Sequence, residues 1–423
     1  VQVGHGGRST NGVVQNAPVS ITTQNGGSLT LQGGSPPATS GSSNRTYAQV
    51  GHGGWGSAVD VSGSDLTASI DGAISLLGGN SADAYAQLGH GGRDADANYA
   101  SNISVTAGGA VELRGGLIGD ETYAQIGHGG ANADGTKDGT VEVTAASLLL
   151  NGRDVNANYA QIGHGGHNGL GSIGGALASN ITVTVTNDID LLGNDEGSGT
   201  AHTQIGHGGH NSGAAGDTVA GTISVTSQNG SITLTGSVGG SANSATQIGH
   251  GGYQSDYAVS DQGITVAADA GAIAVIGSGA QNQTQIGHGG ELSTGAMSGA
   301  ITVTAQDDIS LTGGGNGDST AQIGHGGADA TGGDYAGGIE VHSSAGAVTL
   351  TSGTNTDAVA QIGHGGPYGA ATSASLSGDI CVVAGTMVTL DAAPDGGNQT
   401  YTQIGHGGFN LEGAKSGDIT VTS

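Results

Sequence analysis

One histidine, set in the string Gln-Ile-Gly-His-Gly-Gly or a close variant, recurs eleven times in this chain of 423 residues, at intervals of 36 to 47 residues. These histidines are His5, His52, His90, His128, His164, His207, His250, His288, His325, His364 and His406. Imidazole is the commonest protein ligand for transition metals, so the pattern could indicate metal chemistry. No Cys, Asp or Glu keeps a fixed offset from the histidine, whereas structural zinc needs four ligands and catalytic zinc three plus water. We therefore predict a structural ladder of corner histidines, with no metal, no cofactor and no catalytic role.

The glutamine of the same string forms a second regular set. Its members are Gln49, Gln87, Gln125, Gln161, Gln204, Gln247, Gln285, Gln322, Gln361 and Gln403. Identical polar side chains that stack on one another can form hydrogen bonds along the stack. The pattern predicts a structural glutamine ladder that runs parallel to the histidines.

The remaining candidates for binding chemistry are weaker. His167, His202, His210 and His342 lie at unrelated positions and are interpreted as incidental. Asp94-x-Asp96-x-Asn98 and Asp154-x-Asn156-x-Asn158 resemble the start of a calcium loop, but neither has the Gly and distal Glu of an EF-hand. These acidic loops indicate at most weak Ca²⁺ contact.

Nothing in the chain predicts catalysis. The seven Lys and Arg residues are dispersed, no pair of carboxylates recurs in one strand column, and no G-x-S-x-G string is present. Trp55, Tyr253 and Phe409 each follow a signature directly and could be exposed contact residues, but each occurs once. We expect the protein not to be an enzyme.

Composition narrows the class of protein further. The formal charge of −27 excludes a phosphate-binding surface for nucleic acid and disfavours anionic membranes. Gly accounts for 89 residues, aromatic residues for 3%, and there is a single cysteine, Cys381, so no internal disulfide forms. No apolar run is long enough to span a membrane, so we expect no membrane insertion. These features favour a thin aliphatic core and a bacterial protein outside the cell.

Three strand-like segments must position the histidine in each repeat. The first, as in residues 301–305, alternates apolar and polar residues, which is the period of a half-buried strand. The second is represented by residues 309–314, and the third carries the signature, as in residues 123–130. Loops rich in Asn, Asp, Ser and Gly separate the segments and absorb the variation in repeat length.

A unit of this size cannot bury its own apolar face, but stacked copies can. The sequence therefore predicts an all-β fold: a right-handed parallel β-helix (β-solenoid) of about eleven repeats of roughly 40 residues, with three strands per repeat. Residues 1–423 would form one solenoid domain, uncapped at both ends and part of a longer chain or filament. One coil per repeat is preferred over two, and an eleven-bladed propeller is the alternative fold.

Pairs of threonines in the first segment, such as Thr302/Thr304 and Thr420/Thr422, resemble the arrays of ice-binding β-helices. The column is interrupted at Glu142, at Glu340 with His342, and at Cys381 with Val383. Because threonine is also a good exposed strand residue, we interpret the column as structural.

The strings Ser298-Gly-Ala-Ile-Thr-Val-Thr-Ala and Asp308-Ile-Ser-Leu-Thr-Gly-Gly resemble repeats of the filamentous-haemagglutinin-like exoproteins of Gram-negative bacteria. The resemblance covers the first and second segments of nearly every repeat, but not the Gln-Ile-Gly-His-Gly-Gly corner. It implies a secreted adhesin with a right-handed β-helical shaft at the cell surface, and no catalytic residues carry over.

We therefore expect a structural extracellular protein that forms the rod of a cell-surface fibre, biofilm-matrix filament or adhesin shaft. Copies are expected to associate end to end as a homopolymer, and a glycan or host surface is a further candidate partner. The alternative function is a carbohydrate- or ice-binding surface module on the same β-helix.

Overall fold

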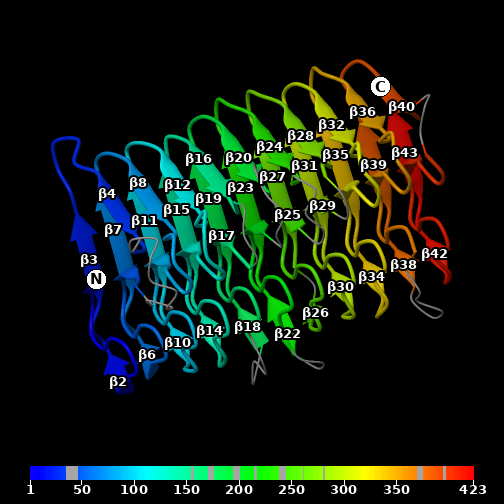
Figure 1. Ribbon diagram of the computed structural model, residues 1–423. Coiled ribbons are helices and arrows are strands. Elements are labelled where there is room, and N and C mark those ends of the chain that lie inside the picture. Colours follow the sequence, from blue (N-terminus) through cyan, green and yellow to red (C-terminus); the bar gives the residue numbers. More distant parts are fainter. Residues whose placement is uncertain are drawn as a thin grey trace.

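The computed structural model describes residues 1–34, 46–153, 157–169, 176–193, 201–213, 217–237, 244–260, 262–279, 282–368, 375–393 and 397–423. Within these residues every regular element is a β-strand, and none is a helix that could cross a membrane. The strands stack in parallel, coil upon coil, from the N-terminus to the C-terminus (Figure 1). The fold is a parallel β-solenoid.

Three long sheets run along the stack, and in the described residues two of them contain eleven strands and the third ten. Sheet 1 holds the first segment of each repeat: β3 (Val19–Thr22), β7 (Leu66–Ile70), β11 (Ile103–Ala107), β15 (Val141–Ala145), β19 (Ile181–Val185), β23 (Ile223–Ser227), β27 (Ile264–Ala268), β31 (Ile301–Ala305), β35 (Ile339–Ser343), β39 (Ile380–Val383) and β43 (Ile419–Thr422). Sheet 2 holds the second segment: β4 (Leu29–Gln32), β8 (Ile74–Leu77), β12 (Val111–Arg114), β16 (Leu148–Asn151), β20 (Ile189–Leu192), β24 (Ile232–Thr235), β28 (Ile273–Ile276), β32 (Ile309–Thr312), β36 (Val348–Thr351) and β40 (Val388–Asp391).

Sheet 3 holds the signature strands. They are β1 (Gln2–Val3), β5 (Ala48–Val50), β9 (Ala86–Leu88), β13 (Ala124–Ile126), β17 (Tyr159–Ile162), β21 (His202–Ile205), β25 (Ser244–Ile248), β29 (Asn282–Ile286), β33 (Thr320–Ile323), β37 (Ala360–Ile362) and β41 (Thr402–Ile404). The strand register joins each residue to its equivalent one repeat later, for example Gln125 to Gln161 and Ile126 to Ile162. Each repeat is therefore one coil, as preferred from the sequence, and the propeller alternative is wrong.

A fourth, short strand follows each of the eleven signatures, where the sequence predicted only a loop. These strands are β2 (Asn11–Gln15), β6 (Ala58–Ser62), β10 (Tyr99–Ala100), β14 (Lys137–Asp138), β18 (Ala176–Ala178), β22 (Thr218–Ala220), β26 (Ala258–Val259), β30 (Met297–Ser298), β34 (Tyr335–Ala336), β38 (Leu376–Ser377) and β42 (Lys415–Ser416). Most have two or three residues, which is too short for an alternating pattern to show in the sequence.

The main core lies between the three long sheets. In sheet 1, Ile301 and Val303 are buried while Thr302 and Thr304 are partly exposed, as the alternation predicts. Ile, Val and Leu of sheets 1 and 2 and the aliphatic residue of sheet 3 join in one continuous cluster along the stack. Full burial of such a side chain contributes about 1.5–3 kcal/mol, so stacking supplies the stability that a single coil lacks.

Candidate functional site

The eleven signature histidines stack in a single column at the end of sheet 3. Neighbouring imidazole rings are nearly parallel, and their centroids are 4.7–5.2 Å apart from His5 to His406. The rings from His52 to His364 are almost completely buried. The column follows the corner between sheet 3 and the turn that leads through the short strands to sheet 1.

From His52 to His406, both ring nitrogens of the signature histidines are bonded to the backbone. Nδ1 of His128 accepts a hydrogen bond from the backbone N–H of His90 in the preceding coil, at 3.1 Å. Since Nδ1 is the acceptor, Nε2 carries the proton, and it donates to the carbonyl oxygen of Ser101 at 2.7 Å. The same pair of contacts recurs from His52 to His406, with Nδ1 distances of 2.9–3.2 Å and Nε2 distances of 2.6–3.0 Å. These imidazoles have no free lone pair to offer a metal ion.

Burial keeps the imidazoles from His52 to His364 neutral. Loss of hydration lowers the pKa of His164 to about 4, and the same cause lowers the pKa of His128 well below its usual 6.5. Charges on the adjacent rings of the stack lower the pKa of His128 further. A neutral column is the state in which Nδ1 can accept the backbone N–H.

The signature glutamines form a second column on the opposite face of sheet 3. Nε2 of Gln161 donates to the carbonyl oxygens of Gly206 at 3.0 Å and Gly208 at 2.7 Å, both in the next coil. It also lies 3.1 Å from Oε1 of Gln204, so the amides are linked along the stack. Gln2, which was not among the predicted ladder residues, makes the equivalent two glycine contacts, at 2.9 and 2.5 Å.

The glycines around the histidine are required by close approach between coils. A Cβ atom on Gly127 would overlap the carbonyl oxygen of Gly163 in the next coil. Gly129, directly after the histidine, has a φ of +81°, which residues with a Cβ rarely adopt. The corner is therefore a tight arch whose carbonyl groups are satisfied by the glutamine amides.

Away from its two end strands, sheet 3 is buried on both faces. Residues of the turn after the signature pack on its outer face, as Ala131 does with Tyr123 and the neighbouring tyrosines. Two side-chain columns meet there, and we call them together the seam. The inner column is the residue two positions before the signature glutamine: Tyr47, Tyr85, Tyr123, Tyr159, His202, Ala245, Gln283, Thr320, Val359 and Tyr401. The outer column is the residue eight positions later: Trp55, Arg93, Ala131, His167, His210, Tyr253, Glu291, Ala328, Pro367 and Phe409.

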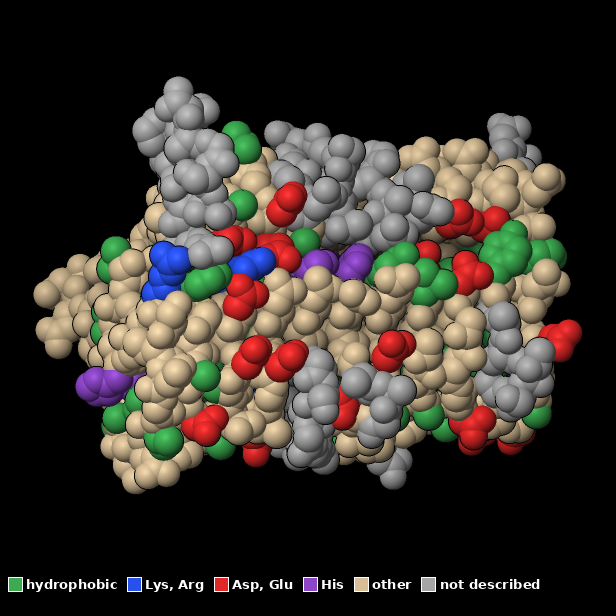
Figure 2. Space-filling model, turned by 60° about the horizontal axis from the view of Figure 1, so that its bottom comes forward, with side chains coloured by type: hydrophobic (Ala, Val, Ile, Leu, Met, Phe, Trp, Pro, Cys, Tyr) green, Lys and Arg blue, Asp and Glu red, His purple; other side chains and the backbone are tan. Residues whose placement is uncertain are grey.

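The seam varies from coil to coil, in contrast to the repeated ladders. Toward the N-terminal end the tyrosine rings of the inner column stack 4.6–4.9 Å apart. Figure 2 shows side chains of every class along one surface band, with Lys and Arg toward one end and His near the middle. The side chains whose chemical type changes from coil to coil therefore lie in the seam, whereas the signature keeps the same residues in every coil.

Arg93 of the seam is held by three carboxylates. Its Nε lies 3.0 Å from Oδ1 of Asp83, and its terminal nitrogens contact Asp94 and Glu121. The Arg93 side chain is only 16% exposed. Loss of hydration would lower the pKa of the Arg93 guanidinium, but the three carboxylates outweigh that cost and raise it.

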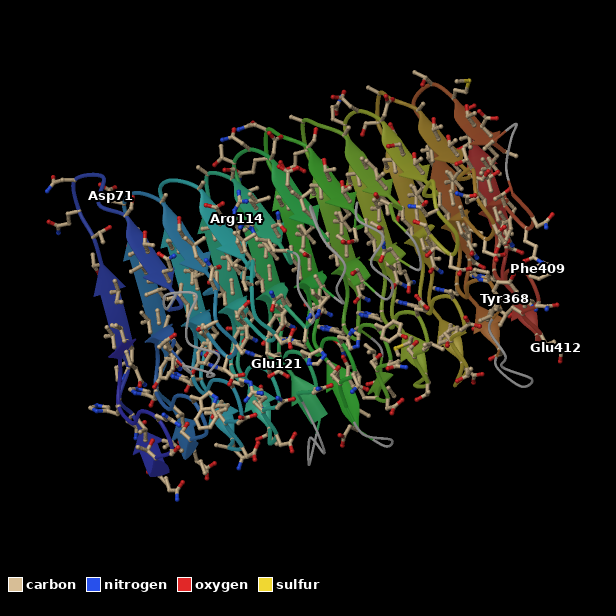
Figure 3. The ribbon with its side chains drawn as sticks, in the orientation of Figure 1. Asp71, Arg114, Glu121, Tyr368, Phe409 and Glu412 are labelled. Carbon is tan, nitrogen blue, oxygen red and sulfur yellow. The ribbon has the colours of Figure 1, made fainter. Side chains whose placement is uncertain are left out.

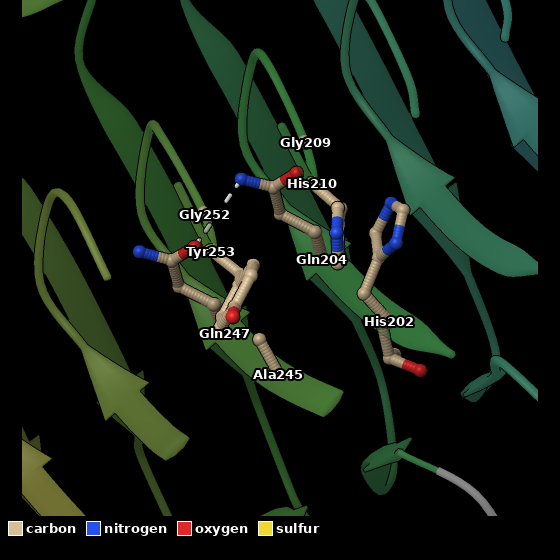
Figure 4. A pocket seen from close by; sticks show the side chains of 9 residues that line it. His202, Gln204, Gly209, His210, Ala245, Gln247, Gly252 and Tyr253 are labelled. Carbon is tan, nitrogen blue, oxygen red and sulfur yellow. Dashed lines mark hydrogen bonds between the residues drawn. The ribbon is translucent and has the colours of Figure 1, made fainter. Parts of the chain in front are cut away.

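Three histidines interpreted as incidental meet in the middle of the seam. The ring centroids of His167 and His210 are 5.0 Å apart, and those of His202 and His210 are 6.4 Å apart. A small pocket beside them is lined by His202, His210 and Tyr253, where the small side chain of Ala245 interrupts the inner column (Figure 4). The interpretation as unrelated positions is wrong, and the constant offset of eight residues, as between His202 and His210, was the signal that could have revealed it.

The calcium-like string Asp94-x-Asp96-x-Asn98 serves the turns between coils. Asp94 contacts Arg93, and Oδ1 of Asp96 accepts the backbone N–H of Asp134 at 3.1 Å. Asn98 accepts hydrogen bonds from Thr136 in the same way. Asp154 and Asn156 of the second string lie outside the described residues. In the part of the chain that is described, no group of three His, Cys, Asp or Glu side chains could hold a metal ion.

The outer face of sheet 1 carries the threonine column. Thr302 is paired in register with Glu340, and Glu340 with Cys381, so the row of threonines is broken over β35 and β39. His342, the fourth histidine outside the signatures, lies on the same face. No family model, curated protein or solved structure matches this chain.

Proposed function

We propose that this protein is a structural rod of an extracellular bacterial fibre or adhesin shaft. One observation supports the proposal more than the others. The polar side chains of the repeated signature form hydrogen bonds with backbone groups of the solenoid and so connect neighbouring coils. Both nitrogens of His128 and the amide of Gln161 are bonded to backbone groups of the scaffold. A motif repeated for binding or catalysis would instead present these atoms to solvent.

The resemblance to filamentous-haemagglutinin-like exoproteins supports an extracellular place for the rod. It rests on the apolar and threonine pattern of sheets 1 and 2, and the parallel solenoid is the fold which that resemblance implies. The formal charge of −27 keeps such a surface soluble and away from nucleic acid. In this proposal the chain has neither a catalytic role nor a bound cofactor.

End-to-end association of copies is part of the same proposal. Each coil offers the next the same pattern of backbone donors, acceptors and stacked side chains, so a coil from another copy could continue it. Ten steps of about 4.8 Å make one chain about 48 Å long. Filaments formed by stacked copies should be several times longer than this.

Negative-stain electron microscopy of the purified protein tests both parts. We expect rods, and we expect their length to grow as added salt screens the repulsion between acidic copies. The same sample at low ionic strength is the matched control. Rings or compact particles would contradict the rod, and rods of single-chain length at every salt concentration would contradict end-to-end association.

A further inference from the structure

Three carboxylates surround Arg93, an arrangement that we call a cage, and the same arrangement of carboxylates occurs a second time beside the seam. The first cage lies in the coil of the signature histidine His90. Asp83 comes seven residues before His90 and Asp94 four residues after it, and Glu121 comes seven residues before the next signature histidine. Relative to His325, the same three offsets give Asp318, Asp329 and Asp357. The two cages therefore present carboxylates at equivalent places in two different coils.

The backbone at the two cages is also the same. Asp83, Asp94 and Glu121 have φ values of 65°, 54° and 57°, and Asp318, Asp329 and Asp357 have 57°, 52° and 61°. The N–H groups of Asp94 and Asp329 each donate to the outer-column residue of the next coil, in both cases at 2.9 Å. The second cage is thus built on the same turns as the first.

The cages differ in what lies between the carboxylates. The first contains the guanidinium of Arg93, whereas the second has the methyl group of Ala328 at that position. In the second cage Asp357 accepts a hydrogen bond from the hydroxyl of Tyr368 at 2.8 Å, and Tyr368 lies near the C-terminal end of the stack (Figure 3). Glu291, in the outer column of the preceding coil, adds a fourth carboxyl. The sequence has no Lys or Arg from residue 154 to residue 414, so the chain supplies no cation there.

The electrostatics of the second cage are correspondingly unfavourable. Burial and the neighbouring Asp329 and Asp318 raise the pKa of Glu291 to about 8. Burial and Asp357 raise the pKa values of Asp318 and Asp329. Figure 2 shows Lys and Arg among the acidic side chains toward the N-terminal end of the band, and acidic side chains without them toward the other end.

Two buried polar atoms of the inner column, close to the second cage, also have no hydrogen-bond partner in the described part of the chain. Oε1 of Gln283 makes no hydrogen bond, although the side chain is only 4% exposed, and it lies beside Gly327, the residue before Ala328. The hydroxyl of Thr320 is unpartnered and equally buried, and strand pairing places Thr320 next to Gln283. Buried polar atoms of this kind call for a partner.

We propose that the cage of Asp318, Asp329, Asp357 and Glu291 binds a guanidinium group that an arginine side chain of a partner polypeptide supplies. Arg93 is the template within the same fold, because the equivalent carboxylates already hold this group. The planar fork of a guanidinium can contact several carboxylates at once, which an ammonium group does less well. Asp318, Asp329 and Glu291 are partly exposed, so the cage can be reached from solvent.

Calorimetric titration of the whole chain with N-acetyl-arginine amide at low ionic strength tests the proposal, with the neutral citrulline analogue as the matched ligand. We expect one arginine amide to bind per chain and the citrulline analogue not to bind. Asp329→Asn should weaken binding about tenfold, since it removes one charge-assisted contact. Asp269→Asn, which removes a carboxylate from an exposed turn elsewhere, should leave binding unchanged.

Ala328→Arg gives a second, independent measurement. It places a guanidinium in the cage in the manner of Arg93, so it should raise the melting temperature and abolish binding of the arginine amide. Equal binding of arginine and citrulline analogues, or unchanged binding by Asp329→Asn or Ala328→Arg, would overturn the proposal. Tighter binding of Ca²⁺ than of the arginine amide would overturn it as well.

Discussion

The neutral histidine column predicts a steep loss of stability in mild acid. Burial lowers the pKa values of His90, His164, His250 and His325 from 6.5 to about 4. Between these two values the unfolded chain binds protons that the folded chain does not. Stability is therefore fully present above the unfolded pKa of 6.5, and it is lost as the pH falls toward the folded value of about 4.

The magnitude follows from the size of these shifts. At about pH 5 each of these four histidines contributes a loss on the order of 2 kcal/mol, which gives about 8 kcal/mol from these four alone. This is comparable with the whole stability of an ordinary domain. Glu291 acts in the opposite direction, because its pKa is raised to about 8 and its protonated form is favoured in the folded state. The variant Glu291→Gln removes that opposing contribution.

Urea unfolding of Glu291→Gln, followed by circular dichroism at a series of pH values, measures the effect. We expect the free energy of unfolding to fall between about pH 6.5 and pH 4.5 with a slope of at least about four protons, because burial also lowers the pKa values of His128, His207, His288 and His364. Nitrogen NMR of labelled histidine should show Nε2–H rings that remain neutral at about pH 5. A free energy that does not change over this range, or rings that titrate near their ordinary pKa, would refute the reasoning.

Three further predictions follow from the ladders and the seam. Gln161→Leu should lower the free energy of unfolding by about 1–3 kcal/mol in a urea titration, because two buried glycine carbonyls lose their donor; an unchanged midpoint would mean that the amide is dispensable. Gly127→Ala should either prevent folding to the native circular dichroism spectrum or lower the melting temperature strongly. Gly317→Ala is the control and should be tolerated, because its added Cβ meets only ordinary contacts. Equal effects of the two variants would argue against the tight arch. Arg93→Met should cost about 3 kcal/mol at neutral pH because it leaves buried carboxylates without a cation, and the loss should shrink in acid; a loss independent of pH would point to packing instead.

The strands and their stacking are predicted well from the sequence, because the same alternation of apolar and polar residues recurs in every repeat. The first strand of residues 301–305 appears as β31 at the predicted bounds, and stacking in register follows from a unit that cannot bury its own apolar face. The histidine and glutamine columns follow from the same register. Once equivalent residues of successive repeats are stacked along one axis, the positions of both columns are determined.

The sequence does not predict which outward-facing residues become buried. Tyr123 and Gln125 lie opposite the core in the alternation, and they are buried only because a later turn covers them. Lys137 is a clearer example, because a lysine in a polar segment is predicted from the sequence to be exposed. In the structure it is fully buried, and its ammonium group donates to the carbonyl oxygens of Ala133 and Gly135 at 2.9 and 2.8 Å. Contacts between a turn and a distant strand leave no local periodic signal.

The number of residues in a repeat varies, but the distance between neighbouring coils along the axis does not. The step from His128 to His164 takes 36 residues and the step from His164 to His207 takes 43, yet the rings are 4.7 and 4.8 Å apart. The axial spacing between coils is thus independent of the number of residues in a repeat. Such a scaffold could carry grafted peptides at equivalent turns of successive coils, where they would be spaced regularly along the axis.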